Sequence, residues 1–183
     1  RRGEELAITR TLARLGIPIL RTLSGSALME GGSFAWINER TAVIGCGIRV
    51  NREGAEQVGE VLKRQGVELL IIDLFGYDLH IDGSFQMIGK DLAIVDPFGL
   101  PYSFLQKLKE LKVQTVEISP ADDRWIINSL AVAPGELLMP EGASNQTLDA
   151  LAKRGVSWTV VPYGKMQLNG GGIHCSTTPL IRD

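Results

Sequence analysis

Cysteine and histidine are scarce in this chain of 183 residues, which contains two of each. Cys46 and Cys175 lie far apart in the sequence, so a disulfide framework is not expected and a reducing cytoplasm is the expected compartment. Neither the two histidines nor the two cysteines have the short ligand spacing of a zinc site. A bound metal is therefore not expected.

Long apolar runs and blocks of like charge are also missing. The apolar run at residues 67–74 contains Glu68 and Asp73 and has the length of a strand, so no segment is expected to cross a membrane. No secretory signal opens the sequence. The net charge of −2 is spread along the chain without a basic stripe, which argues against nucleic acid as a partner.

The composition fits one globular domain that spans residues 1–183 and has its own core, since 44% of the residues are hydrophobic. The sequence opens at Arg1 without a methionine and enters a helical pattern at once. We therefore expect an N-terminal segment to be missing from this chain.

One pattern recurs along the sequence: an amphipathic helix that is followed by a strand. The helices are expected at residues 2–15, 52–65, 102–112 and 146–154, with Asn51 as one N-cap and Ser144 or Asn145 as another. The strands are expected at residues 17–20, 67–72, 113–118 and 156–161. The helix ends fall at positions 16, 66, 112 and 155, a nearly even spacing that indicates repeated units.

Additional strand material lies between successive helices. Short polar turns join three predicted hairpins, formed by residues 34–37 with 41–44, 84–88 with 92–95, and 128–132 with 137–139. Each unit therefore has one helix and about three strands, and four such units predict an α/β propeller-like array around a common axis. A doubly wound sheet is disfavoured, because one strand per helix leaves the hairpins unexplained.

Few residues can supply a nucleophile and a base. His174 and Cys175 are neighbours, and on a strand their side chains would point to opposite faces, so His174 is a poor base for Cys175. His80 is the alternative base, and on a strand it would project to the same side as Asp82. A lone cysteine is, however, more often a small buried hydrophobe.

Glycines flank two further candidates. Glu30 enters from an apolar segment and precedes Gly31-Gly32, which let the backbone turn tightly and let a ligand approach. Gly170-Gly171-Gly172 precedes Cys175 and is not a phosphate-binding loop, because no Lys-Ser/Thr and no helix follow. A metal site built from Glu30, His80, Asp82 and Cys175 is disfavoured, since it would mix one soft ligand with hard ones.

Taken together, Glu30-Gly31-Gly32, His80-Ile81-Asp82 and Gly170-Gly171-Gly172-Ile173-His174-Cys175 resemble the guanidino-group modifying enzymes, which include arginine deiminases, dimethylarginine dimethylaminohydrolases and amidinotransferases. The resemblance implies a pentein-type five-bladed α/β propeller. Because four of five repeats are visible, the first blade is expected upstream of Arg1. Two departures are Ser33, where the family's hydrolases usually have Asp, and the lack of a substrate-binding Asp before Glu30.

The resemblance also implies roles for the candidate residues. Cys175 would attack the guanidinium carbon of a small-molecule substrate, with Glu30 and Asp82 binding the guanidinium, His80 transferring protons and Arg49 binding the substrate carboxylate. No cofactor is needed for this chemistry. Glu30 stands where the family's transferases tend to have Asp, which favours a hydrolase.

Three other functions remain as alternatives. They are an amidinotransferase, a non-catalytic binding module on the same fold, and a cysteine hydrolase of amides or peptides. An incomplete propeller would also leave open strand edges and an uncovered apolar face, so association with a second copy or with the missing segment is expected.

Overall fold

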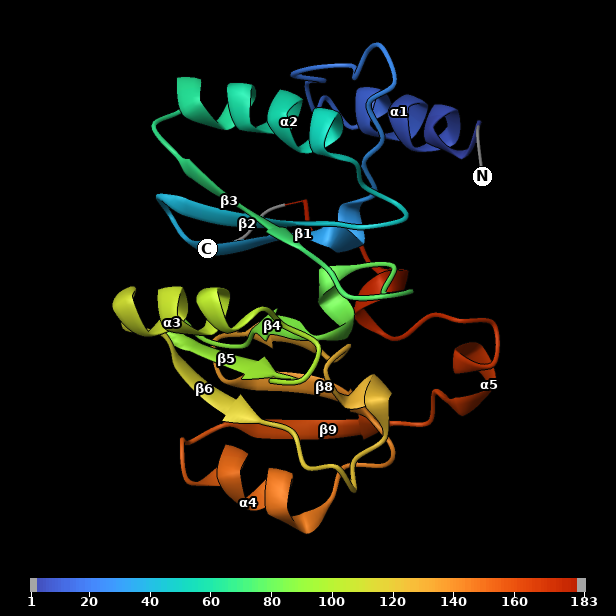
Figure 1. Ribbon diagram of the computed structural model, residues 1–183. Helices are drawn as coiled ribbons and strands as arrows, with labels where there is room; N and C mark the ends of the chain where they lie inside the picture. Colours follow the sequence, from blue (N-terminus) through green and yellow to red (C-terminus); the bar gives the residue numbers. More distant parts are fainter. Residues whose placement is uncertain (1–2, 181–183) are drawn as a thin grey trace.

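The computed structural model describes residues 3–180 of the chain and contains three separate three-stranded sheets (Figure 1). The fold is therefore α/β, as the sequence predicts. The sheets contain β1 (Phe34–Asn38), β2 (Thr41–Cys46) and β3 (Glu68–Asp73); β4 (Phe85–Met87), β5 (Leu92–Val95) and β6 (Gln114–Glu117); and β7 (Leu130–Ala133), β8 (Glu136–Pro140) and β9 (Ser157–Val161). The three predicted hairpins are confirmed.

Every sheet is built in the same way. An antiparallel hairpin is followed by a helix, and the next strand returns parallel to the second strand of the hairpin. The connecting helices are α2 (Arg52–Arg64), α3 (Tyr102–Glu110) and α4 (Asn145–Ala152). The strand after each helix thus completes the sheet begun before that helix, so the structural unit is a hairpin, a helix and a strand.

Local sequence signals explain where these helices begin and end. The side chains of Asn51 and Ser144 accept hydrogen bonds from backbone amides in the first turns of α2 and α4, so both predicted N-caps are confirmed. Gly66 and Gly155 follow α2 and α4 with positive φ values of 76° and 71°. Lys112 takes the same left-handed position after α3, with φ of 61°, although it carries a side chain.

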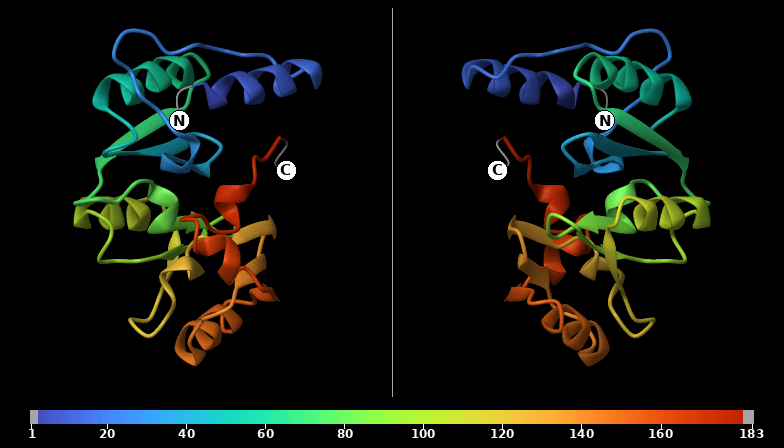
Figure 2. Two further views of the ribbon diagram at one scale, coloured as in Figure 1. Left: turned by 90° about the vertical axis from the view of Figure 1, so that its right-hand side faces the viewer. Right: turned by 90° about the vertical axis from the view of Figure 1, so that its left-hand side faces the viewer.

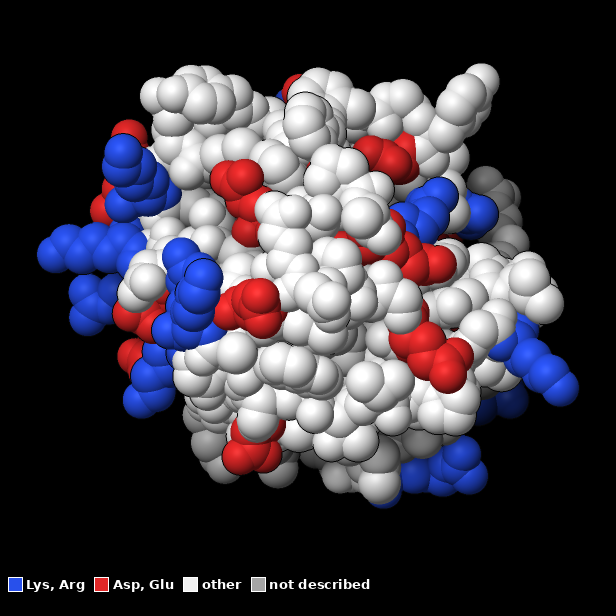
Figure 3. Space-filling model, turned by 90° about the horizontal axis from the view of Figure 1, so that it is seen from below, with Lys and Arg blue, Asp and Glu red and all other residues white. Residues whose placement is uncertain are grey.

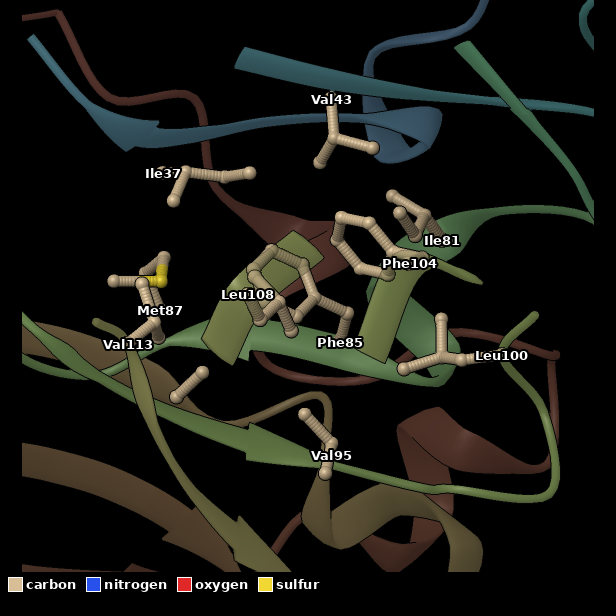
Figure 4. Packing of buried hydrophobic residues seen from close by; sticks show 11 residues of the cluster. Ile37, Val43, Ile81, Phe85, Met87, Val95, Leu100, Phe104, Leu108 and Val113 are labelled. Atoms are coloured by element: carbon tan, nitrogen blue, oxygen red, sulfur yellow. The ribbon is translucent and has the colours of Figure 1, made fainter. Parts of the chain in front are cut away.

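The helix of one unit packs against the sheet of the unit before it. Ile37 and Val43 from the first sheet belong to the same buried cluster as Phe104 and Leu108 of α3 (Figure 4). In the next unit, Leu151 of α4 belongs to a cluster with residues of β5 and β6. Because one sheet and one helix cannot bury their apolar faces alone, this packing fixes the order of the units.

The N-terminal part of the described chain differs from the sequence prediction. The helix α1 (Glu4–Arg14) forms, but it has no buried residue and lies at the same end of the molecule as α2 (Figure 2). Residues 17–20 were expected to form a strand and do not, because a strand needs a partner for its backbone groups and none lies beside them in residues 3–180. Three complete units are therefore present instead of four.

Short 3₁₀ turns precede the first strand of each sheet. They are η1 (Gly31–Ser33) before β1, η2 (Ile81–Gly83) before β4 and η3 (Arg124–Ile126) before β7. A fourth turn, η4 (His174–Ser176), follows β9 and the short helix α5 (Gly164–Gln167). Contacts join η1 to η2 and β1 to η2, and the red segment containing η4 lies beside the green segment of η2 (Figure 1). Turns from different units thus meet in one region.

The surface carries charges of both signs. Seen from below, blue and red side chains are interspersed, with much of the blue at the left edge (Figure 3). Basic residues occupy the last turns of α2 and α3, where their positive charges interact favourably with the negative ends of the helix dipoles. Among residues 3–180, no helix has the length and apolar character needed to span a bilayer.

The N-cap of α2 provides a test of this architecture. Asn51 Oδ1 accepts from the amides of Gly54 and Leu28, and Asn51 Nδ2 donates to the Ser26 carbonyl. We expect Asn51→Ala to lower the free energy of unfolding by about 2 kcal/mol, and Ser144→Ala, which removes a simple cap, by about 1 kcal/mol. Denaturant titration measures both, and equal losses would show that the contacts to the 26–28 segment add nothing.

Candidate active site

The structure brings all five sequence-predicted site residues to one cavity of about 310 Å³. Met166, Asn169 and the 170–171 glycines, which follow or belong to α5, form part of its wall. The lining residues from the predicted set are Glu30, Arg49, His80, Asp82 and Cys175. Residues from the first two units and from the segment after β9 therefore share one space.

Glu30 is the centre of one cluster of charges. It stands directly before η1, and its Oε2 lies 2.7 Å from His80 Nε2 while its Oε1 accepts from Arg49 Nη1 at 3.1 Å. Burial alone raises the pKa of the Glu30 carboxyl, but the His80 hydrogen bond and the charges of Arg49 and His80 outweigh it and hold the pKa below its ordinary value. The carboxylate is thus charged at neutral pH.

The predicted pairing of His80 with Asp82 is wrong. Residues 81–83 form the turn η2 instead of a strand, so His80 points to Glu30 and Asp82 points to a different set of partners. Gly32 is required beside the imidazole, because a Cβ at this position would lie 2.7 Å from His80 Nδ1. Both side chains still reach the cavity.

The expectation that His174 and Cys175 lie on a strand is also wrong. They belong to η4, where successive side chains need not point to opposite faces. His174 Nδ1 lies 3.0 Å from Asp82 Oδ2, and the Cys175 thiol donates to the same oxygen at 3.4 Å. His174 is therefore part of the site's hydrogen-bond network, and the preceding glycines were the sequence signal for the turn that places it there.

The two cysteines have different environments. Burial raises the pKa of the Cys175 thiol, and the negative charge of Asp82 raises it further, while hydrogen bonds from Gly172 and Asn128 lower it only in part. Cys175 is exposed as a whole residue although its thiol is partly covered by protein, whereas Cys46 is buried in β2, where burial raises the pKa of its thiol too. Of the two, Cys175 alone lines the cavity with carboxylates beside it.

Ser33 departs from the family pattern and does not line the cavity. It is fully buried, and its hydroxyl donates to the backbone carbonyl of Leu79 at 3.4 Å, just before His80. Its role in this structure is to join η1 to the segment that carries His80. In residues 3–180, no group of three or more His, Cys, Asp or Glu side chains is arranged to hold a metal ion.

Two curated proteins match the sequence over most of this chain. An uncharacterized protein from Aeropyrum pernix is 27% identical over 98% of the chain, and an arginine deiminase from Listeria welshimeri is 24% identical over 85%. The chain spans 63% and 47% of the lengths of these relatives. No protein-family model matches it.

Solved structures give a closer match in three dimensions. The N-terminal domain of ArgZ, an arginine dihydrolase of Cyanobacteria, aligns with a TM-score of 0.86 at 18% identity and covers 100% of this chain and 67% of that one. The chain has the fold of the guanidino-group modifying enzymes. The resemblance predicted from the motifs is thereby confirmed.

Two other enzymes of different reaction type share the fold. A mutant of DDAH from Pseudomonas aeruginosa, complexed with citrulline, aligns with a TM-score of 0.79 at 20% identity and covers 96% of this chain and 65% of that one. SxtG, an amidinotransferase from Microseira wollei, aligns with a TM-score of 0.75 at 14% identity, with 97% and 61% covered. The fold alone therefore does not distinguish hydrolysis from transfer.

The contact between Cys175 and Asp82 can be tested by alkylation. The raised pKa means that the reactive thiolate of the free protein forms at a higher pH than for an ordinary cysteine. We expect Asp82→Asn to remove the repelling charge and to move the pH–rate profile for iodoacetamide to lower pH, so that labelling at neutral pH becomes faster. Cys175→Ser is the control that measures labelling of Cys46. A profile that Asp82→Asn leaves in place would show that Asp82 does not control the thiol.

Proposed function

We propose that the protein hydrolyses the guanidinium group of arginine or of an arginine derivative, through a covalent thiouronium intermediate on Cys175. The observation that carries this proposal is the cavity itself, whose wall combines one thiol with two carboxylates, one of which accepts the thiol's hydrogen bond. Carboxylates would repel the oxyanion formed in amide hydrolysis, whereas they attract a cationic substrate. This charge arrangement therefore favours a guanidinium over an amide or a peptide.

Substrate binding uses the carboxylates first. A guanidinium presents its N–H groups in one plane, and Asp82 and Glu30 can accept them in charge-assisted hydrogen bonds that hold the carbon in front of Cys175. In the free protein Arg49 occupies one oxygen of Glu30. We assign Arg49 to the substrate's α-carboxylate, so binding would exchange its contact with Glu30 for one with that carboxylate.

Binding of a cation also prepares the nucleophile. Burial and Asp82 keep Cys175 in the thiol form when the site is free. A bound guanidinium neutralises Asp82 and adds a positive charge beside the sulfur, so the thiol releases its proton to solvent and becomes the thiolate when substrate is present.

The first half of the reaction forms the intermediate. The thiolate attacks the guanidinium carbon, and the electrons of one C–N π bond move to nitrogen to give a neutral tetrahedral adduct. Protonated His80, held by Glu30, donates its proton to the departing nitrogen. The C–N bond breaks, ammonia or an amine leaves, and the S-alkylthiouronium cation remains with a neutral His80.

The second half releases the product. Neutral His80 takes a proton from water, and the hydroxide adds to the thiouronium carbon. The C–S bond then breaks, which returns the thiolate and leaves the ureido product after its hydroxyl proton passes to solvent. His80 is again protonated, so the cycle consumes one water and no external reagent.

Transfer to an amine is the second candidate function. It shares the first half of the reaction and replaces water by an acceptor amine, and the similarity to the SxtG amidinotransferase supports it. The ArgZ dihydrolase and the citrulline complex of DDAH support hydrolysis. We favour hydrolysis because this chain has Glu30 where the family's transferases tend to have Asp. Glu30 also pairs with His80, the proposed proton carrier.

The fold proposal follows from the same resemblance. The three described sheets would be consecutive blades of the five-bladed pentein propeller, within a single catalytic domain. Their 3₁₀ turns would then surround the propeller axis and the cavity, which is consistent with the contacts between η1 and η2. Two further blades would then complete the propeller, and one of them would be expected to contribute to the substrate site.

The proposed reaction predicts ureido product from arginine or a substituted arginine. In the full-length protein, Cys175→Ala should lower turnover by about 10³-fold or more, because the nucleophile is lost. Cys46→Ser, in the buried strand β2, is the matched control and should retain turnover. Colorimetric ureido assays and ammonia release measure both variants. Wild-type protein that converts no guanidino compound would refute the proposal.

Hydrolysis and transfer give different labels in the product. With water enriched in ¹⁸O, hydrolysis places the label in the ureido oxygen, which mass spectrometry detects. With glycine or ornithine added as acceptor, transfer would instead yield a new guanidino compound and no labelled ureido product. We expect the labelled ureido product in both cases, because His80 activates water for the second step.

A further inference from the structure

Asn128 lies outside the cavity wall but connects two of its parts. It is 1% exposed and follows η3, just before β7, so it belongs to a different unit from Asp82 and Cys175. A buried amide must satisfy its donor and acceptor groups, and such groups are costly to leave without partners. The hydrogen-bond partners of Asn128 therefore show which segments its side chain holds together.

The oxygen and the nitrogen of the Asn128 side-chain amide bridge the turns η2 and η4. Its Oδ1 accepts the backbone N–H of Cys175 at 3.1 Å, and its Nδ2 donates to the backbone carbonyl of Asp82 at 3.2 Å. Its own backbone carbonyl accepts the N–H of His174 at 3.1 Å. One residue thus fixes the backbone of the nucleophile relative to the backbone of the carboxylate that contacts it.

The same amide explains one glycine of the Gly170–Gly172 segment. A Cβ at Gly172 would lie 2.2 Å from Asn128 Oδ1, closer than any real contact, although the backbone there has no positive φ. Gly172 is therefore needed for space and not for backbone conformation. The turn η4 can approach Asn128 only because this side chain is missing.

We infer that Asn128 is a positioning residue for Cys175, which holds the thiol beside Asp82 without touching the substrate; this inference rests on the proposed function. Without the bridge, η4 keeps its local turn but loses its fixed distance from η2. Small displacements of a nucleophile lower the rate of the chemical step more than they weaken substrate binding. The amide also opposes the rise in the pKa of the Cys175 thiol that burial and Asp82 cause.

Turnover gives the first test. In the full-length protein, Asn128→Ala should lower kcat about 10- to 100-fold and change KM by less than about threefold. The matched control is Ser129→Ala, since Ser129 is the adjacent fully buried residue and its hydroxyl bonds the Ile126 carbonyl at 2.7 Å, away from both turns. Ser129→Ala should retain kcat even where it lowers the melting temperature.

Alkylation gives a second test that needs no turnover. Chloroacetamidine is a cation and chloroacetamide is a neutral reagent of similar size, so the ratio of their rates at Cys175 reports the proximity of Asp82. We expect this ratio to fall about tenfold in Asn128→Ala and to stay unchanged in Ser129→Ala. A wild-type protein without guanidino turnover would refute the proposed function, while this ratio would still decide the role of Asn128.

A second variant, which retains the Asn128 amide, controls for a folding defect in Asn128→Ala. Gly172→Ala retains Asn128 but forces the turn away from it, and it should produce the same loss of kcat and of the reagent ratio. If Asn128→Ala and Gly172→Ala keep kcat and the ratio at wild-type values, or if Ser129→Ala loses them equally, Asn128 is a structural residue and the inference is overturned.

Discussion

The rest of the site depends on the hydrogen bonds that the Asp82 carboxylate accepts. One of its oxygens receives both the Cys175 thiol and the His174 imidazole, although 93 positions separate Asp82 from Cys175 in the sequence. A buried carboxylate is costly unless it is paired or hydrogen-bonded, and these partners supply the hydrogen bonds to Asp82. The Cys175 thiol thus lies where it donates a hydrogen bond to a buried carboxylate.

The repeated units supply the rigidity that this arrangement needs. The helices α3 and α4 pack against the sheet of the preceding unit, and the first strand of each sheet follows a 3₁₀ turn. Burial of the apolar faces between neighbouring units therefore brings the turns together. Contacts between the turns themselves are not needed for this. Asn128 then connects two of these turns through backbone groups, which leaves the Asp82 and Cys175 side chains free for the cavity.

Two acidic groups whose pKa values are shifted in opposite directions share the cavity. The partners of Glu30 hold its pKa low, so it is a carboxylate at neutral pH, whereas burial and Asp82 hold the pKa of Cys175 high. The free site therefore combines a protonated thiol with a carboxylate that is paired with Arg49. Under the proposed function, this combination would restrict thiol reactivity to the state in which a cation is bound.

The sequence by itself determined the repeated helix and hairpin pattern and the cap at Asn51, because these follow from local periodicity and capping signals, and it left Ser144 or Asn145 for the second cap. Sequence motifs and the family resemblance proposed Glu30, His80, Asp82 and Cys175, and the resemblance alone proposed Arg49. Tertiary structure alone decided which groups pair. Alternation along a strand predicted His80 with Asp82 and excluded His174, but 3₁₀ turns redirect these side chains. Asn128 had no signal in the sequence, since its role depends on hydrogen bonds to backbone groups that lie 46 and 47 positions away and meet only after the units pack.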